Sequence, residues 1–397
     1  MDKELLKIID NDKKYYMNTF GDRLPVCFES GEGIKLYSTD GKVYYDFMAG
    51  IAVNCLGYGN KKLEDAICNQ VKKLLHTSSL YYIKSQAELA KVLCENSFAD
   101  KAFFANSGAE ANEGAIKLAR KYFYKKNEEK YEIITLKNSF HGRTLTTVSA
   151  TGQEKYQKPY SPLTPSFVHV EKNDIDALKS AINEKTGAIM LELIQGESGV
   201  VPLDKDYVKE VRQICDDNDI VLIIDEIQTG MGRTGKLFCY ENYGIEPDIM
   251  TLAKALAGGV PIGAVLAKDK FCAFEPGDHG TTFGGNHLAT STALCVVEEL
   301  LFGGVLQNAK DVGEYLIKSL NELKEKTDKI KEVRGMGLMV GIELSVPENK
   351  KYASQLFEKG ILVGTIGTNI FRLVPPLIIT KEDIDMFIKN LYEVLKG

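Results

Sequence analysis

The sequence predicts an α/β protein with a large domain, built on a mostly parallel central sheet, and a small α+β domain. Three observations support this. The chain has 397 residues, which is long for a single domain. From about residue 61 to residue 300, continuous apolar runs alternate with helical patterns, as in parallel sheets with helical crossovers. Beyond residue 306 a charged helical pattern gives way to short strand-like runs. We therefore expect an N-terminal segment at 1–60 that contributes to the small domain, a large domain at 61–300 and a C-terminal small domain at 301–397.

Local patterns predict the elements in chain order. Two alternating runs, Gly33–Tyr37 and Lys42–Phe47, are joined by an Asp-Gly pair and predict a β-hairpin. In the large domain we expect strands at Lys101–Ala105, Tyr131–Leu136, Ala188–Leu193 and Ile220–Asp225, and helices at Ala109–Tyr124 and Leu203–Asn218. In the last segment we expect a helix from Leu306 to Lys329, strands at Gly337–Glu343, Gly360–Val363 and Phe371–Val374, and an amphipathic helix from Lys381.

Composition and charge exclude several classes of protein. A net charge of -6 provides no basic surface for nucleic acid. The 8 cysteines have no C-x-x-C spacing and indicate reduced thiols in a cytoplasmic protein, and the 5 histidines form no ligand cluster, so we expect no metal site. The apolar stretch Ile249–Ala267 is long enough to suggest a membrane span, but it contains Lys254, a Gly-Gly pair and Pro261, which argue against one.

Lys254 is the most informative residue, because it is the single charge in the apolar stretch Ile249–Gly263. Apolar surroundings disfavour the ammonium, which lowers the pKa and yields a nucleophilic amine able to form a Schiff base. Pyridoxal phosphate (PLP) needs such a lysine, and it also needs a carboxylate at its pyridine nitrogen. Asp225, at the end of a predicted strand, is the candidate carboxylate, although a strand-end acid can equally cap the next turn.

Two turns are candidates for binding a phosphate. Ser107–Ala109 lies between a predicted strand and helix, where free backbone N–H groups bind anions, although an ordinary N-cap has the same composition. Thr281 and Thr282 open a second hydroxyl-rich turn, which could also be a plain loop. The glycines of 230–235 match G-x-G-x-x-G and nearly a P-loop, but Leu237 replaces the required Ser or Thr. We interpret this segment as a flexible loop beside the active site rather than as a nucleotide site.

Further side chains suit an aromatic cofactor and a carboxylate substrate. Phe140 could stack on a pyridine ring, and Arg143 could bind a carboxylate through two hydrogen bonds. Core packing and a surface ion pair are the respective alternatives. Arg372 is a charge within an apolar strand and needs an anion, either a carboxylate side chain or a substrate. Glu197 follows the strand predicted at Ala188–Leu193.

Together these residues resemble the class III (ornithine/GABA type) PLP-dependent aminotransferases, collinearly over nearly the whole chain. The matching segments are Asn106–Glu113, Phe140–Arg143, Gln195–Glu197, Asp225–Gly230, Leu252–Gly259 and Thr282–Asn286. Within the class, the acetylornithine aminotransferase branch is most similar, through Tyr16–Phe20, Ala49–Asn54, His76–Tyr82 and Phe371–Pro376. One departure is the turn Tyr58–Asn60, where the family usually has His-x-His-Pro.

The resemblance implies fold type I of the PLP enzymes and a homodimer with shared active sites. It implies that Lys254 bonds to PLP and carries the reacting proton, and that Asp225 keeps the pyridine nitrogen protonated. The implied cofactor-binding residues are Ser107, Gly108, Ala109, Phe140, Asp225, Glu226, Gln228, Lys254 and, from the partner subunit, Thr282. The implied substrate-binding residues are Arg143, Thr281, Glu197 and Arg372, with Glu197 pairing to Arg372 when the substrate end is uncharged.

The implied reaction transfers the terminal amino group of N2-acetyl-L-ornithine to 2-oxoglutarate, within arginine biosynthesis. Its products are N-acetyl-L-glutamate 5-semialdehyde and L-glutamate. The alternatives are an aminotransferase for succinylornithine, succinyldiaminopimelate, ornithine or GABA, a glutamate-1-semialdehyde aminomutase, and a binding protein without activity. The setting of Arg372 before Val374–Pro376 argues against the aminomutase, and the joint presence of Lys254, Asp225 and Arg143 argues against a binding protein.

Overall fold

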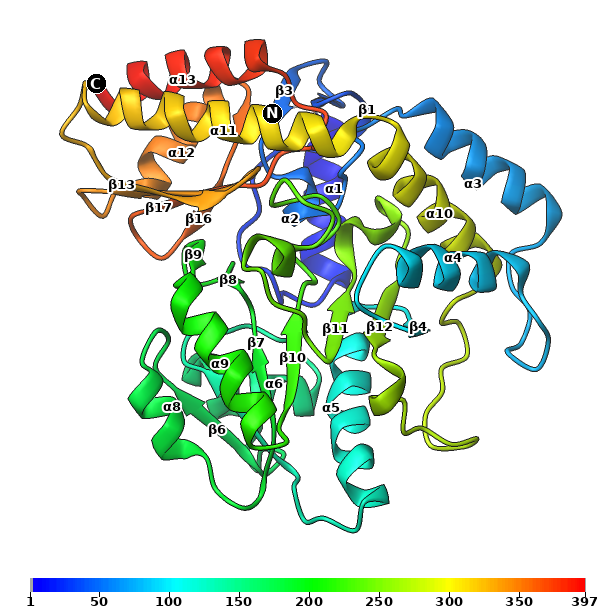
Figure 1. Ribbon diagram of the computed structural model, residues 1–397. Coiled ribbons are helices and arrows are strands. Elements are labelled where there is room, and N and C mark those ends of the chain that lie inside the picture. The colour runs from blue at the N-terminus through cyan, green and yellow to red at the C-terminus, as the bar shows by residue number, and fades with distance from the viewer. Residues whose placement is uncertain (1–2, 397) are drawn as a thin grey trace.

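The computed structural model describes residues 3–396; Met1, Asp2 and Gly397, at the outer ends of the predicted segments 1–60 and 301–397, lie outside the described residues. Its centre is a seven-stranded sheet (Figure 1). In spatial order the strands are β4 (Lys101–Ala105), β12 (Gly263–Ala267), β11 (Ile249–Leu252), β10 (Val221–Asp225), β7 (Thr186–Leu191), β5 (Glu132–Leu136) and β6 (Phe167–Val170). Neighbours are parallel except where β12 pairs with β11 and β4. The predicted mostly parallel central sheet is confirmed.

Helices cover both faces of this sheet, which explains its continuous apolar strands. Every residue of β7, β10, β11 and β12 is buried. Helix α5 (Gly108–Lys125) packs against β4, β11 and β12, and α9 (Lys205–Asp217) packs against β10. The apolar stretch Ile249–Ala267 does not form one long helix. It forms the sheet strands β11 and β12, with the 3-10 helix η3 (Lys254–Ala257) between them.

Two smaller four-stranded sheets and an antiparallel pair, β8 (Ile194–Gln195) with β9 (Val201–Pro202), complete the fold. One contains β1 (Phe28–Glu32), β2 (Lys35–Ser38), β3 (Val43–Asp46) and β15 (Ile361–Leu362). The other contains β13 (Ile330–Met336), β14 (Met339–Leu344), β17 (Ile370–Leu373) and β16 (Gly364–Ile366). The predicted hairpin is confirmed as β2 and β3, and β15 lies parallel to β3. Residues from early and late in the chain therefore share one sheet.

Helices α11 (Val305–Lys324) and α12 (Asn349–Glu358) pack against the later strands, and α13 (Lys381–Lys396) packs against these two helices, at the upper left of Figure 1. The remaining helices are α1 (Lys3–Tyr15), α2 (Ala49–Ala52), α3 (Lys61–Lys73), α4 (Lys84–Glu95), α6 (Leu145–Ala150), α7 (Glu154–Gln157), α8 (Ile175–Ala181) and α10 (His287–Phe302). The short elements are β8 (Ile194–Gln195), β9 (Val201–Pro202), η1 (Lys158–Tyr160), η2 (Cys239–Asn242) and η4 (Asp269–Phe271). Within residues 3–396 no single helix is long and apolar enough to cross a membrane. Only α10 and α11 taken together reach the required length and apolar composition, and their axes bend by 64° where they meet.

Most predicted elements end one or two residues from their observed bounds, and two of the differences matter here. The helix predicted to reach Lys329 stops at Lys324, shortly before β13. The strand predicted at Ala188–Leu193 is shifted toward the N-terminus, because Thr186 pairs with Glu132 of β5. Glu192 consequently lies just beyond the end of β7, where a polar side chain can leave the sheet.

Candidate active site

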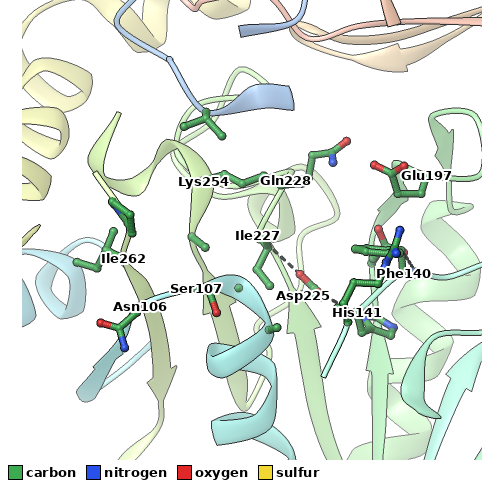
Figure 2. Close-up of a pocket in the computed structure, with 18 of the residues that line it drawn as sticks. Asn106, Ser107, Phe140, His141, Glu197, Asp225, Ile227, Gln228, Lys254 and Ile262 are labelled. Carbon is green, nitrogen blue, oxygen red and sulfur yellow. Dashed lines mark hydrogen bonds and ion pairs between the residues drawn. The ribbon is translucent and has the colours of Figure 1, made fainter. Parts of the chain in front are cut away.

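A cavity of about 370 Å³ opens where β4, β5, β7, β10 and β11 end. Ligands of open α/β sheets bind outside the carboxyl ends of the strands, so the position itself favours a site. Its walls come from the segments that follow these strands and from Val53 of the N-terminal part. In Figure 2, Lys254 and Gln228 lie above Asp225 and His141, with Ser107 on one side and Glu197 on the other.

The turn from β4 into α5 forms one wall and suits an anion. Ser107 is the N-cap of α5 and its hydroxyl accepts a hydrogen bond from the Glu110 backbone N–H at 3.2 Å. Ser107, Gly108 and Ala109 all line the cavity, beside the positive end of the helix dipole. A Cβ atom at Gly108 would lie 2.8 Å from the Ile227 side chain, so glycine is needed for close packing here. The N-cap is therefore confirmed, and the same turn stays the predicted anion site.

Lys254 begins η3 directly after β11 and lines the cavity. Its backbone is in the left-handed region, with φ of 46°, a conformation that is costly for a residue with a side chain and that clusters at functional sites. Burial lowers the pKa of Lys254 to about 8, although the nearby Glu197 carboxylate opposes this change. Near neutral pH the unprotonated, nucleophilic form of this amine is therefore far more abundant than in an ordinary lysine.

Asp225 is the last residue of β10 and is 4% exposed. Its Oδ2 accepts a hydrogen bond from Asn112 Nδ2 at 2.8 Å and lies 2.8 Å from His141 Nδ1. Its Oδ1 accepts from the Ile227 backbone N–H at 3.0 Å, as the dashed line in Figure 2 marks. Asp225 does not merely cap a turn, because it also lines the cavity.

Glu192 is a second carboxyl group in the wall, and the sequence pattern gave it no role. It accepts a hydrogen bond from the Phe140 backbone N–H at 2.8 Å. Burial raises the pKa of Glu192 to about 7, with a further contribution from the charge of Asp225 and an opposing one from His141. The cavity therefore holds one acidic group that is readily protonated near neutral pH.

Phe140 and Arg143 follow β5 and both line the cavity. Phe140 is half-buried, whereas Arg143 is exposed. The guanidinium of Arg143 lies 4.2 Å from the ring centre of Tyr156 and 5.5 Å from that of Phe140. Within residues 3–396 Arg143 forms no ion pair, so its hydrogen-bond donors are available to a ligand carboxylate.

Arg372 on β17 finds its anion in Glu197. The two side chains form an ion pair through Nη1 and Oε1, and Arg372 is 5% exposed. Burial disfavours the charged form of Glu197, but the contact with Arg372 prevails and lowers the pKa of Glu197 below its ordinary value. Arg372 Nε is buried without a partner among the described residues. Glu197 lines the cavity while Arg372 lies behind it, so the carboxylate separates the arginine from the cavity.

Besides Arg372, three predicted residues are placed away from the cavity lining. Glu226 is fully buried and accepts hydrogen bonds from the Cys239 and Tyr240 backbone N–H groups at 2.6 and 2.8 Å. Thr281 accepts a hydrogen bond from Asn106 Nδ2 at 2.8 Å and is thus one residue removed from the cavity. Thr282 is exposed.

The loop 230–236 differs from its predicted flexible character. Residues 230–234 are buried, and Arg233 Nη1 donates hydrogen bonds to the carbonyls of Leu338 at 3.1 Å and Pro375 at 2.5 Å. These bonds tie the loop to the C-terminal strands.

Sequence reasoning gave no role to several residues that shape the cavity. Ile227 and His141 lie within the segments Asp225–Gly230 and Phe140–Arg143, so closeness in sequence to Asp225 and Phe140 was an available signal. Val53 comes from the N-terminal part, and no local pattern indicated that it would reach the cavity. Gly196 has a role that only the structure shows, because a Cβ atom there would lie 2.3 Å from Gln228 Oε1.

Comparisons with known proteins agree with this geometry. The family model described as Aminotransferase class-III matches residues 16–395. The acetylornithine aminotransferase of Methanocaldococcus jannaschii is 53% identical over 391 residues, covering 97% of each chain. That of Caldanaerobacter subterraneus subsp. tengcongensis is 50% identical over 389 residues, covering 98% of this chain and 99% of the relative.

Solved structures give the same result. An ornithine aminotransferase from Toxoplasma gondii superposes with a TM-score of 0.94 at 30% identity, covering 99% of this chain and 95% of that chain. An acetylornithine aminotransferase from Elizabethkingia anophelis has a TM-score of 0.88 at 32% identity and covers 99% of both chains. The cavity at the strand ends, its Lys254–Asp225 arrangement and these matches lead to one conclusion: the chain belongs to the class III aminotransferases.

Proposed function

We propose that this protein transfers the terminal amino group of N2-acetyl-L-ornithine to 2-oxoglutarate, a step of arginine biosynthesis. The products are N-acetyl-L-glutamate 5-semialdehyde and L-glutamate. The observation that carries the proposal is the placement of Lys254 in one cavity with Glu197, whose carboxylate pairs with Arg372. The two relatives that are about half identical over nearly the full length are acetylornithine aminotransferases, which supports this substrate.

PLP is the cofactor of class III aminotransferases, and the residues present fit it. The N-terminus of α5 suits its phosphate, Asp225 suits its pyridine nitrogen, and Phe140 and Ile227 provide apolar walls for its ring. Gln228 is the candidate partner for its phenolic oxygen. When bound, PLP supplies an electron sink that stabilises negative charge on the substrate carbon that loses a proton.

The protein side chains then divide the chemistry. The unprotonated amine of Lys254 supplies the nucleophile that anchors the cofactor, and it moves the proton to and from the substrate carbon. Its lowered pKa matches this task, because a base is most effective when its pKa lies near the working pH. The Asp225 carboxylate holds the proton on the ring nitrogen and thereby keeps the electron sink effective.

The pair of Glu197 and Arg372 explains how one cavity accepts two different substrates in turn. With acetylornithine bound, the uncharged reacting end needs no counterion, and Glu197 neutralises Arg372. With glutamate or 2-oxoglutarate bound, the second carboxylate takes the place of Glu197 on Arg372, whose Nε offers a free donor. The exposed guanidinium of Arg143, with Thr281 nearby, is the candidate for binding the α-carboxylate of the substrate.

We further infer a homodimer in which Thr282 reaches the cofactor phosphate of the partner subunit. Thr282 is exposed and directly precedes Phe283, and Phe283, Leu80, Tyr81 and Tyr82 are large apolar side chains left exposed, as is common at surfaces that associate with another protein. A cytoplasmic location is supported by the 8 cysteines, all of which are free thiols. We also propose that the chain divides into an N-terminal segment at 1–60 that contributes to the small domain, a large domain at 61–300 and a C-terminal small domain at 301–397.

The test is the visible absorption of the purified holoenzyme while amines are added one at a time. We expect acetylornithine to convert the yellow enzyme to its colourless amine form far more readily than ornithine or GABA, and 2-oxoglutarate to restore the yellow form. Preference for ornithine or GABA would retain the class and replace the substrate. A protein that binds no PLP would overturn the proposal entirely.

A further inference from the structure

The carboxylate of Asp225 accepts hydrogen bonds from residues that the proposed function does not use. Asn112 Nδ2 and His141 Nδ1 both lie 2.8 Å from Oδ2, and the Ile227 backbone N–H donates to Oδ1 at 3.0 Å. A carboxylate offers about four lone-pair sites. The donors therefore fill Oδ2 and leave one site on Oδ1, in a residue that lines the cavity.

Asn112 is itself fixed by a complete set of hydrogen bonds. Its Oδ1 accepts from the Thr251 hydroxyl at 2.7 Å, and its Nδ2 also donates to the His141 carbonyl at 2.7 Å. Asn112 is 0% exposed, so water cannot replace a lost partner. Rotating the amide would break three buried hydrogen bonds at once, and this fixes the donor that faces Asp225.

His141 is also held in place on the side that faces Asp225, while its Nε2 is buried without a partner among the described residues. Its backbone N–H donates to the Thr151 hydroxyl at 2.9 Å, and its side chain is fully buried against Asp225. Because a carboxylate accepts, Nδ1 of His141 carries the hydrogen in this contact. Asn112 belongs to α5 and His141 follows β5, so two separate elements hold the same oxygen atom.

Helix α5 connects this contact to the opposite end of the cavity. Its first residues provide the proposed phosphate site, and its next turn carries Asn112. One rigid helix thus sets the distance between the group that would hold the phosphate and the group that would hold the ring nitrogen.

We propose that Asn112 and His141 are positioning residues that fix the Asp225 carboxylate, as an anion and in one orientation, for the ring nitrogen of the cofactor. This inference deepens the proposed function and rests on it. Each N–H donor stabilises the negative charge on Asp225, and this charge in turn retains the proton on the ring nitrogen. Neither residue needs to touch the cofactor to have this effect.

The charged and titratable groups around Asp225 come from several elements. Lys254 follows β11, Glu192 follows β7, Glu226 follows β10 and His141 follows β5, and each interacts electrostatically with Asp225 or contacts it directly. A variant that leaves all of them in place is therefore required to isolate the hydrogen bonds.

The test is the Asn112→Leu variant, which keeps the branched shape and the number of heavy atoms and removes every hydrogen bond of the amide. The matched control is Asn308→Leu, which also removes two donated hydrogen bonds, to the carbonyls of Leu377 and Ile379, far from the cavity. Two quantities are measured on each holoenzyme: the dissociation constant of PLP, and the pH midpoint of the visible absorption change. The melting temperature of each apoprotein reports structural damage separately.

We expect Asn112→Leu to weaken PLP binding about tenfold or more, as for loss of one hydrogen bond to a charged group, and to raise the pH midpoint. The midpoint rises because the ring nitrogen retains its proton less firmly in this variant. Less positive charge then lies near the Lys254–PLP linkage, and the linkage keeps its own proton to higher pH. Asn308→Leu should leave both quantities at the wild-type values.

Identical PLP affinity and midpoint in Asn112→Leu and Asn308→Leu would overturn the inference. If Asn112→Leu does not fold, Thr251→Val decides, because it removes only the hydroxyl that fixes the amide and should move both quantities in the same direction by a smaller amount. An unchanged midpoint and affinity in that variant would equally refute the positioning role. A wild-type protein that binds no PLP would instead refute the proposed function, so the two failures are distinguishable.

Discussion

Replacing Glu197 with alanine should change which substrate the protein prefers. Glu197 pairs with Arg372 and stands between that arginine and the cavity. Without it, Arg372 has no competing carboxylate when glutamate or 2-oxoglutarate binds, and no partner when acetylornithine binds. We therefore expect kcat/KM to rise for glutamate and to fall for acetylornithine.

The structure sets the size of the change. A hydrogen bond between charged groups contributes about 1.5–3 kcal/mol. The Glu197 side chain keeps 28% of its surface exposed, so water weakens the pair, and we take the lower end of about 1.5 kcal/mol. This is roughly tenfold in each direction. The ratio of the two kcat/KM values should thus change by about a hundredfold.

The assay is single-turnover absorption of the holoenzyme with each amino donor. The control is Glu343→Ala, which removes a carboxylate that pairs with Arg334 in a comparably buried setting away from the cavity lining. If Glu197→Ala slows acetylornithine but leaves glutamate unchanged, Glu197 does not compete for Arg372, and the proposed exchange of partners is wrong.

Four further predictions follow from the same geometry. Lys254→Ala should lose turnover by at least about 10²-fold while circular dichroism shows an intact fold, and wild-type-like turnover would exclude Lys254 as the base. The rate at which apoprotein reacts with PLP should rise with pH through about 8, the pKa of Lys254, rather than near the ordinary lysine value; a rise only above pH 10 would contradict the effect of burial. Burial raises the pKa of Glu192 from 4.5 to about 7, so between these pH values the folded state binds more protons than the unfolded state. The free energy of unfolding of the wild type should therefore fall as the pH rises from 4.5 to 7, and that of Glu192→Gln should fall less. Thermal unfolding measured at pH 4.5 and at pH 7 checks this prediction. Gly196→Ala should displace Gln228 and weaken PLP binding, whereas Gly280→Ala, where an added Cβ meets nothing within 4 Å, should not.

The sequence predicted the chemical groups of the site better than their arrangement. Lys254 and Asp225 each stand out locally, as a charge within an apolar run and as an acid at a strand end, and the structure brings them into one cavity because β10 and β11 are parallel neighbours. The contact between Asn112 and Asp225 joins residues on different elements and depends on how α5 packs against the sheet. No spacing along the chain encodes that packing.

Fold prediction succeeded where periodicity was strong and failed at element ends. The strand at Lys101–Ala105 and the start of the helix at Lys381 agree with the structure residue by residue. The strand now at Thr186–Leu191 was misplaced because a hydrogen-bonded partner, rather than hydrophobicity, decides where a buried strand begins. Glu192, assigned to that strand from sequence, thereby escaped notice as a cavity residue.

The pairing of β3 with β15 has a consequence for how the molecule is made. Tyr45 pairs with Ile361, so one strand must wait during synthesis until almost the entire chain has left the ribosome. Contacts between such distant residues close a long loop and slow folding. The same delay applies to Arg372 and Glu197, which come from late and middle parts of the chain. A nascent chain that ends before β17 could therefore already contain Lys254 and Asp225, yet it would lack the arginine on which the choice between substrates depends.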